Sequence, residues 1–322
     1  MLKKKTMKPL KYYTEVLFEI TCIDRFIFRV SDIRELENMP DELQERLSNC
    51  HIYLICKRPR ITLKTESIEV TTDYIYLTID YRISGESNSA KIKIPRQFFK
   101  PHEVRFEVSE YPHREINTYD SEGNHIATTL LANLAHLFSP LPDEVKDLEV
   151  LYIGKGLKKS AKDRLENHAT LQKILADVNS YEPDMEIFAL VYSFDRAKKH
   201  GLQKNQQKPE IQGDEVAKEH YNKIFNFKPS LDLQVALIEA SLISYFRTDR
   251  YNTHYIDFPQ NLYKLFSEFY EMDFAALIIN IDNENIGNQR IFSQTVSPNP
   301  NHQIITDFRK MEGKFSYLEK TD

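Results

Sequence analysis

The sequence predicts an α+β protein in which a β-rich N-terminal domain precedes a small mixed sheet flanked by helices. Up to about residue 126 the chain consists mostly of short β-branched and aromatic runs separated by turn residues, which is typical of strands. From about residue 127 apolar runs alternate with helical patterns. Because 322 residues suffice for two domains with sizeable cores, we expect one domain over 1–126 and a second over 127–322.

The N-terminal half shows strand patterns almost throughout. Predicted strands cover 16–20, 25–30, 51–56, 72–83 and 91–94. The last of these alternates lysine and isoleucine, which is the period of a half-buried strand. One helix interrupts the series, because Asp41 follows Pro40 and can cap a segment that runs to about residue 47.

The C-terminal half mixes helices with buried strands. Predicted helices cover 128–138, 160–178, 231–247 and 261–270, and predicted strands cover 148–153, 185–194, 274–281 and 290–296. The last two strands are expected to form a hairpin. The strand at 185–194 is apolar along most of its length, so we expect it to be buried on both faces. The Lys- and Gln-rich segment 196–228 is predicted to be an inserted loop, and the chain from about 256 a C-terminal extension.

The composition excludes several classes of protein. The formal net charge is −5, so the chain lacks the positive charge of a protein that coats nucleic acid, and any such contact requires a local basic patch. Its three cysteines lack metal-binding spacing, which argues against zinc and fits a reducing compartment. No apolar segment has the length of a membrane helix, and the N-terminus lacks a signal-peptide core. We therefore expect a soluble, cytoplasmic protein that does not enter a membrane.

One predicted turn from strand to helix carries most of the chemical information. The strand delivers Tyr152 near its end, and Gly154 and Gly156 then allow the chain to turn sharply. On the next helix Arg164 and His168 are four residues apart and share a face. The lysines around the turn are Lys155, Lys158, Lys159 and Lys162. This collection of cationic and hydrogen-bonding groups predicts a site for an anionic substrate such as phosphate.

The apolar helix predicted at 231–247 contains a single acid beyond its first turn, Glu239. A buried carboxylate is costly unless a cation or good hydrogen-bond donors meet it. A divalent metal ion would supply that charge and would also stabilise the transition state of phosphoryl transfer. The alternative is a structural ion pair with Arg247 or Arg250.

Together these segments resemble the GIY-YIG nuclease superfamily over about residues 148–255. The matching elements, in chain order, are Tyr152-Ile153-Gly154, Arg164 and His168, Glu239, and Asn252. The last of these would be mainly structural. The resemblance implies a small sheet flanked by helices and a hydrolase that uses one metal ion.

The resemblance also implies a role for each polar residue. Glu239 would hold one Mg²⁺ or Mn²⁺ ion against the scissile phosphate. Arg164 would bind a phosphate oxygen and stabilise the charge of the transition state. Tyr152 and His168 would position or activate the attacking water, and Lys155 would contact phosphate or make a tyrosine more acidic.

One part of the family pattern is not apparent near this turn. The superfamily carries a first tyrosine a short distance before the Tyr-Ile-Gly tripeptide, but residues 132–145 contain no tyrosine. Tyr119, at the end of a predicted strand, is the substitute, provided that its strand pairs with 148–153.

The expected activity is metal-dependent hydrolysis of phosphodiester bonds in nucleic acid, with DNA as the expected substrate. The N-terminal domain is expected to recognise this substrate, or to contact a protein partner or a second copy of the chain. Two alternatives stay open. One is a protein of the same fold that binds nucleic acid or a protein without cutting, and the other is an enzyme that acts on another phosphorylated small molecule.

Overall fold

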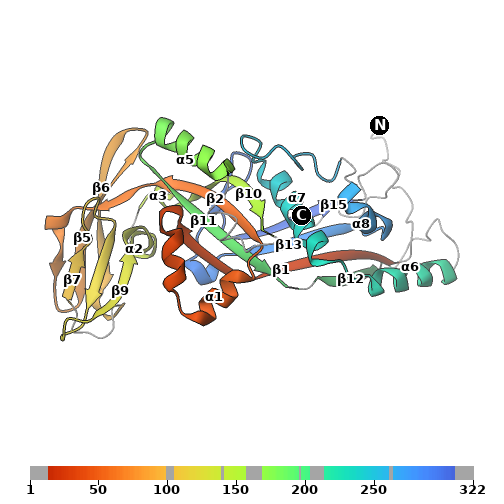
Figure 1. Ribbon diagram of the computed structural model, residues 1–322, viewed down its shortest axis with the longest axis horizontal. Helices are drawn as coiled ribbons and strands as arrows, with labels where there is room; N and C mark the ends of the chain where they lie inside the picture. Colours follow the sequence, from red (N-terminus) through yellow and green to blue (C-terminus); the bar gives the residue numbers. More distant parts are fainter. Residues whose placement is uncertain are drawn as a thin grey trace, which may run out of the picture.

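The computed structural model describes residues 14–98, 105–138, 141–156, 169–195, 197–203, 214–260 and 264–308. Over these residues the chain is an α+β protein, as predicted, with several helices and a large mixed sheet. Figure 1 shows this sheet and its helices in one part of the molecule and a smaller β-rich lobe at the other end.

Seven strands of the eight-stranded central sheet lie in the order β14-β10-β2-β11-β1-β13-β15, and the eighth, β12, pairs with β1. Its strands are β1 (Thr14–Arg29), β2 (Ile52–Pro59), β10 (Leu148–Lys155), β11 (Met185–Phe194), β12 (Lys198–Gln203), β13 (Ala276–Asp282), β14 (Ile291–Phe292) and β15 (Asn301–Asp307). The pairs β10–β14 and β1–β13 are parallel, and the other pairs are antiparallel. Segments from both ends of the chain therefore build one sheet.

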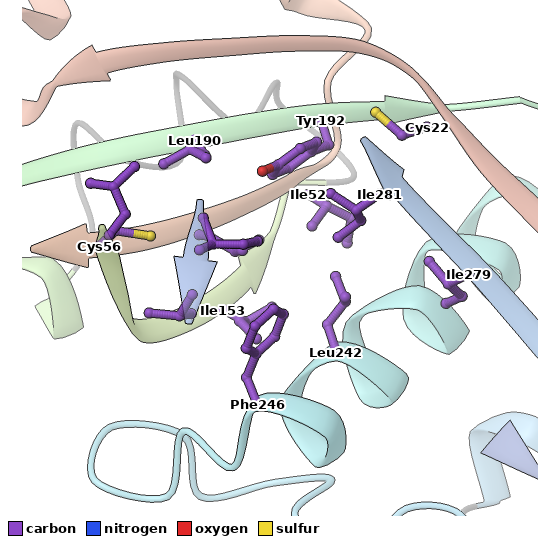
Figure 2. Close-up of a cluster of buried hydrophobic side chains, with 14 of the residues drawn as sticks. Cys22, Ile52, Cys56, Ile153, Leu190, Tyr192, Leu242, Phe246, Ile279 and Ile281 are labelled. Carbon is purple, nitrogen blue, oxygen red and sulfur yellow. The ribbon is translucent and has the colours of Figure 1, made fainter. Parts of the chain in front are cut away.

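One face of this sheet is covered by α7 (Leu231–Phe246), which is buried along almost its whole length. Its N-terminus is capped by Ser230, whose side chain accepts a hydrogen bond from a backbone N–H of the first turn. Figure 2 shows Leu242 and Phe246 of this helix beside Ile153 of β10, in the largest buried cluster of the protein. The length and position of α7 agree with the helix predicted at 231–247.

The opposite face is covered by α5 (Ala169–Tyr181), which packs on the sheet through Leu171, Ile174 and Val178. Because helices lie on both faces, the middle of β11 is buried on both sides, as predicted. The other helical elements are η1 (Val30–Asn38), α1 (Asp41–Ser48), α6 (Asp214–Asn226), η4 (Lys264–Phe266), α8 (Ser267–Glu271) and η5 (Glu284–Ile286). Among the described residues, no helix combines the length and the apolar character needed to cross a membrane.

The smaller lobe is inserted between β2 and β10. Its elements are β3 (Ile61–Leu63), η2 (Thr65–Ser67), β4 (Glu69–Val70), β5 (Tyr74–Ile83), β6 (Glu86–Pro95), η3 (Arg96–Phe98), β7 (Arg105–Val108), β8 (Glu115–Tyr119), β9 (His125–Leu130), α2 (Leu131–Phe138) and α3 (Asp143–Lys146). They form two small sheets, one around β5 and one around β8. Ion pairs from Arg29 to Glu115 and from Arg114 to Glu186 connect the lobe to the central sheet.

The central sheet does not follow the predicted domain boundary at residue 126. β1 and β2, from the predicted N-terminal domain, lie next to β11 and β10 in the same sheet. The predicted strands at 16–20 and 25–30 are one continuous strand, β1, with an irregularity between Cys22 and Arg25. Pairing between distant strands leaves no local pattern in the sequence, so strand propensity alone could not reveal this arrangement.

Three further predictions about single elements were wrong. The segment 196–228 is not only a loop, because it contains β12, which pairs with β1, and α6. The predicted hairpin of 274–281 with 290–296 does not form, since β13 pairs with β15 and β14 pairs with β10. The helix predicted from 128 begins at Leu131, because the preceding residues complete β9.

Candidate active site

The site lies at the end of β10, where this strand runs antiparallel to β2. Their register places Gly154 opposite Tyr53 and Lys155 opposite Ile52. The ring of Tyr53 covers Gly154 so closely that a Cβ added to the glycine would lie less than 3.0 Å from three ring or hydroxyl atoms. The ring of Tyr152 lies beside it, with 6.1 Å between the two ring centroids. Two tyrosines from distant parts of the sequence therefore meet at this strand end.

The two faces of β10 present different groups at this end, because successive side chains of a strand point to opposite faces. Tyr152 and Tyr53 pack into the cluster under α5. Ile153 belongs to the cluster under α7. Lys155 is directed toward α7 as well, since its ammonium group contacts Glu239 of that helix. The predicted tyrosine and the predicted acid thus approach the end of β10 from opposite faces.

Lys155 and Glu239 form an ion pair with 2.7 Å between Nζ and Oε2. Their side chains are 23% and 12% exposed, so the contact is largely shielded from water. Arg247 and Arg250, the alternative partners of this carboxylate, form ion pairs with aspartates instead. The turn after the Tyr-Ile-Gly strand and the acid of the apolar helix therefore do meet in space.

Burial dominates the electrostatics of Glu239. Loss of water raises the pKa of its carboxyl group above the ordinary value, whereas the charge and the hydrogen bond of Lys155 and the charge of His254 act to lower it. The net effect on the pKa is still an increase, so these two residues do not fully compensate the burial. A stronger positive charge beside this carboxylate would favour its ionised form further.

The turn after α7 holds the end of β10 in place. Asn252 accepts a hydrogen bond from the N–H of Ile153 at 3.0 Å and donates one to the carbonyl of Ile153 at 2.8 Å. The hydroxyl of Thr248 donates to Asn252 Oδ1 at 2.8 Å and fixes the amide. Further along the same turn, the ring centroid of Tyr255 lies 5.8 Å from Nζ of Lys155. Asn252 therefore makes the two backbone hydrogen bonds that a neighbouring strand would make at this edge of β10.

The residue just before β2, His51, holds the chain just beyond β10. The N–H of Gly156 donates to the carbonyl of His51 at 2.9 Å, and His51 Nδ1 lies 3.0 Å from the carbonyl of Gly156. The other residues predicted to bind phosphate or to act from the next helix lie outside the described part of the chain. They are Lys158, Lys159, Lys162, Arg164 and His168. The described part of the site therefore consists of the ends of β2 and β10, α7 and the turn after α7.

The substitute proposed for the first tyrosine, Tyr119, was wrong. It lies on β8, whose partners among the described strands are β7 and β9. The strand that pairs with β10 is β2, and it carries Tyr53 at the level of Gly154. Both 51–56 and 148–153 are short apolar runs that contain a tyrosine, but neither run indicates its partner strand. The inserted lobe separates them, so their proximity depends on the tertiary fold.

His254 and Tyr255 also lie near the ion pair, although no sequence motif marks them. Their positions follow from the path of the turn after α7, which begins with Arg247 in the left-handed region at φ 52°. Such a path has no sequence pattern comparable to helical periodicity.

Glu239 is the group that could hold a divalent metal ion in this site. Over the described ranges, no three His, Cys, Asp or Glu side chains gather in a way that would bind one. Mg²⁺ is nevertheless commonly bound through one or two carboxylates, with water and substrate phosphate oxygens as the other ligands. Glu239 is a buried carboxylate that already meets a cation, Lys155, at the end of β10, so it is the residue of the described site that would serve as the one protein ligand.

Comparisons of the chain with protein-family models, curated proteins and solved structures found no match. The function of the chain is therefore inferred from the residues and geometry of this site.

Proposed function

We propose that the chain is a metal-dependent endonuclease of the GIY-YIG type that hydrolyses phosphodiester bonds of nucleic acid at the end of β10. The observation that carries this proposal is the 2.7 Å contact between Lys155 and Glu239. It joins the strand that contains Tyr-Ile-Gly to α7, through the only acid in the interior of that helix. The resemblance rests on these two segments.

The pairing of β2 with β10 supports the same proposal. Tyr53 supplies the first tyrosine that the resemblance requires, on the strand beside Tyr152 and directly over Gly154. The segment between these two strands is then an insertion into the nuclease fold, and the lobe of β3 to β9 is that insertion.

The proposed roles follow from charge and position. Glu239 holds one Mg²⁺ or Mn²⁺ ion, which when bound polarises the phosphate and stabilises the charge of the transition state. Lys155 binds a phosphate oxygen as a compact cation. Tyr152 and His168 position the attacking water, and Arg164 binds a phosphate oxygen. Tyr53, which is 1% exposed and packs under α5, holds the end of the strand.

The inserted lobe offers a surface for substrate recognition. A cleft of about 510 Å³ bordering this lobe is lined by Arg60, Arg82, His113 and Tyr111, and also by Asp80 and by Asp184, which pairs with Arg82. Tyr111 is 87% exposed. Arginine side chains bind nucleic-acid backbones, and exposed aromatic rings stack on bases. We assign recognition of DNA to this lobe, with contact to a protein partner or a second copy of the chain as the other use of its surface.

The direct test is cleavage of supercoiled plasmid and labelled duplex DNA by the purified chain with Mg²⁺ or Mn²⁺. We expect cleavage that EDTA stops and that Glu239→Gln abolishes. Glu149→Gln is the matched control, because Glu149 lies on the same strand as Lys155 and also pairs with a lysine, Lys57. Cleavage that survives Glu239→Gln would contradict the role of the acid.

A second function is favoured by the ion pair itself. Because Lys155 already neutralises Glu239, the same geometry suits a protein that binds nucleic acid or a protein partner without cutting. Absence of cleavage on every nucleic acid tested, together with DNA binding that weakens steeply with salt, would support this function. Binding that is insensitive to DNA length and specific for a small phosphorylated molecule would favour the third candidate, a small-molecule enzyme.

A further inference from the structure

The ammonium group of Lys155 lies on the carboxylate to which the metal ion is assigned. Nζ of Lys155 is 2.7 Å from Oε2 of Glu239, within the distance of a charge-assisted hydrogen bond. A metal ion bound to the same carboxylate would lie about 2.0 to 2.6 Å from one of its oxygens. Two cations would then be a few ångströms apart in a site largely shielded from water, where like charges repel strongly.

Lys155 is the partner in this ion pair that is accessible to an arriving phosphate. Its side chain is 23% exposed, whereas that of Glu239 is 12% exposed, so the lysine is the more accessible partner. Lys155 is the last residue of β10, and its Nζ lies 5.8 Å from the ring centroid of Tyr255. A phosphate oxygen offers a lysine the same kind of charge-assisted hydrogen bond as a carboxylate.

We infer that Lys155 exchanges partners, from Glu239 in the free protein to a substrate phosphate in the complex, and that a divalent ion binds Glu239 only as the lysine leaves. This inference rests on the proposed function, because it uses the metal and phosphate assigned there. Lys155 is then an internal cation that occupies the metal position until nucleic acid is present. Metal and nucleic acid consequently bind cooperatively, and by linkage each raises the affinity for the other by the same factor.

The exchange is testable through Mn²⁺ binding, followed by electron paramagnetic resonance of the free ion and without any cleavage. Lys155→Met removes the ammonium group and keeps most of the aliphatic stem. We expect it to raise the affinity for Mn²⁺ in the absence of nucleic acid by about tenfold or more, since a charge that competes for the site is gone. Lys199→Met is the matched control, because Lys199 is a half-buried lysine whose ammonium group donates to the backbone carbonyls of Phe225 and Phe227 and to no carboxylate among the described residues. It should leave Mn²⁺ affinity unchanged.

Nucleic acid should change the Mn²⁺ affinity of the two proteins to different extents. A short duplex DNA should strengthen Mn²⁺ binding to the natural chain several-fold, and this gain should be smaller in Lys155→Met, in which there is no lysine to displace. Glu239→Gln should lose the Mn²⁺ site with and without DNA. If Lys155→Met binds Mn²⁺ no better than the natural chain, the exchange is refuted.

Two further measurements separate the inference from folding and from catalysis. Lys155→Arg retains a cation at the position, so it should bind Mn²⁺ no more tightly than the natural chain; a gain in this variant would overturn the competition. If Lys155→Met is unstable, its thermal unfolding should be delayed by Mn²⁺ more than that of the natural chain, and an equal or smaller delay counts against the inference. A gain of Mn²⁺ binding in Lys155→Met, together with no DNA cleavage by the natural chain, would support the competition at Glu239 and contradict the proposed nuclease activity.

Discussion

Gly154 of β10 lies directly under the ring of Tyr53, and there is no space for a Cβ between them. The backbone of Gly154 does not adopt the left-handed conformation that favours glycine, so the requirement for glycine here is steric. This contact joins the two strands that hold the candidate active site. The inserted lobe separates these strands in the sequence.

The first prediction concerns this contact. Gly154→Ala should lower the free energy of unfolding by about 1–3 kcal/mol, as expected for an overpacked site, because the new methyl group meets the ring of Tyr53. Urea unfolding followed by circular dichroism measures the loss. The double variant Tyr53→Leu with Gly154→Ala should lose less stability than the sum of the single variants, and strict additivity would show that the two residues do not meet.

A second prediction concerns the hydroxyl of Tyr152. If this group positions the attacking water, Tyr152→Phe should fold normally but reduce the rate of DNA cleavage by about a hundredfold or more. Single-turnover cleavage of duplex DNA in Mg²⁺ measures the effect. Tyr192→Phe is the control, because the hydroxyl of Tyr192 is buried and bonds Asn283 rather than the strand end. An unchanged rate in Tyr152→Phe would limit Tyr152 to a packing role.

The third prediction concerns Asn252. Asn252→Ala removes both hydrogen bonds to the backbone of Ile153 and leaves two buried polar groups without these partners, so it should cost about 1–3 kcal/mol of stability. Thr248→Val removes only the hydrogen bond to Asn252 and should cost less. Hydrogen exchange of the Ile153 amide gives a local readout: it should accelerate strongly in Asn252→Ala and only slightly in Thr248→Val. Equal exchange in both variants would contradict the proposed closure of this strand edge.

A fourth prediction concerns pH and His302. Burial lowers the pKa of His302, and this effect exceeds the opposing effect of its backbone hydrogen bonds to Asn299 and Ile291. Below the ordinary histidine pKa the unfolded chain therefore takes up a proton that the folded chain does not. The stability contributed by neutral His302 is present above that pKa and is lost as the pH falls toward the lower folded pKa.

Unfolding in urea at about pH 7.5 and about pH 5.5 tests this dependence, since the interval spans the ordinary pKa of histidine. The natural chain should lose more stability on acidification than His302→Gln. The control His125→Gln, at an exposed position, should lose as much stability on acidification as the natural chain. The same pH dependence in His302→Gln and in the natural chain would refute the assignment.

Elements with a strong local pattern could be predicted from the sequence. The apolar run with a single interior acid predicts α7 and the burial of Glu239, and both are present in the structure. The apolar run before Gly154 likewise predicts β10, and the continuous apolar pattern of β11 predicts burial on both faces. In each case the signal is the periodicity of side chains within one segment, which is a local property.

The sequence by itself determined the α+β class, the strand that ends in Tyr152 and the buried acid of α7. Only the tertiary structure decided that β2 lies beside β10, that Tyr53 covers Gly154 and that Lys155 meets Glu239. Local patterns fix whether a segment forms a helix or a strand and which of its faces is apolar. The choice of partner depends on how distant segments bury those faces together, and this information is shared among segments that are far apart in the chain.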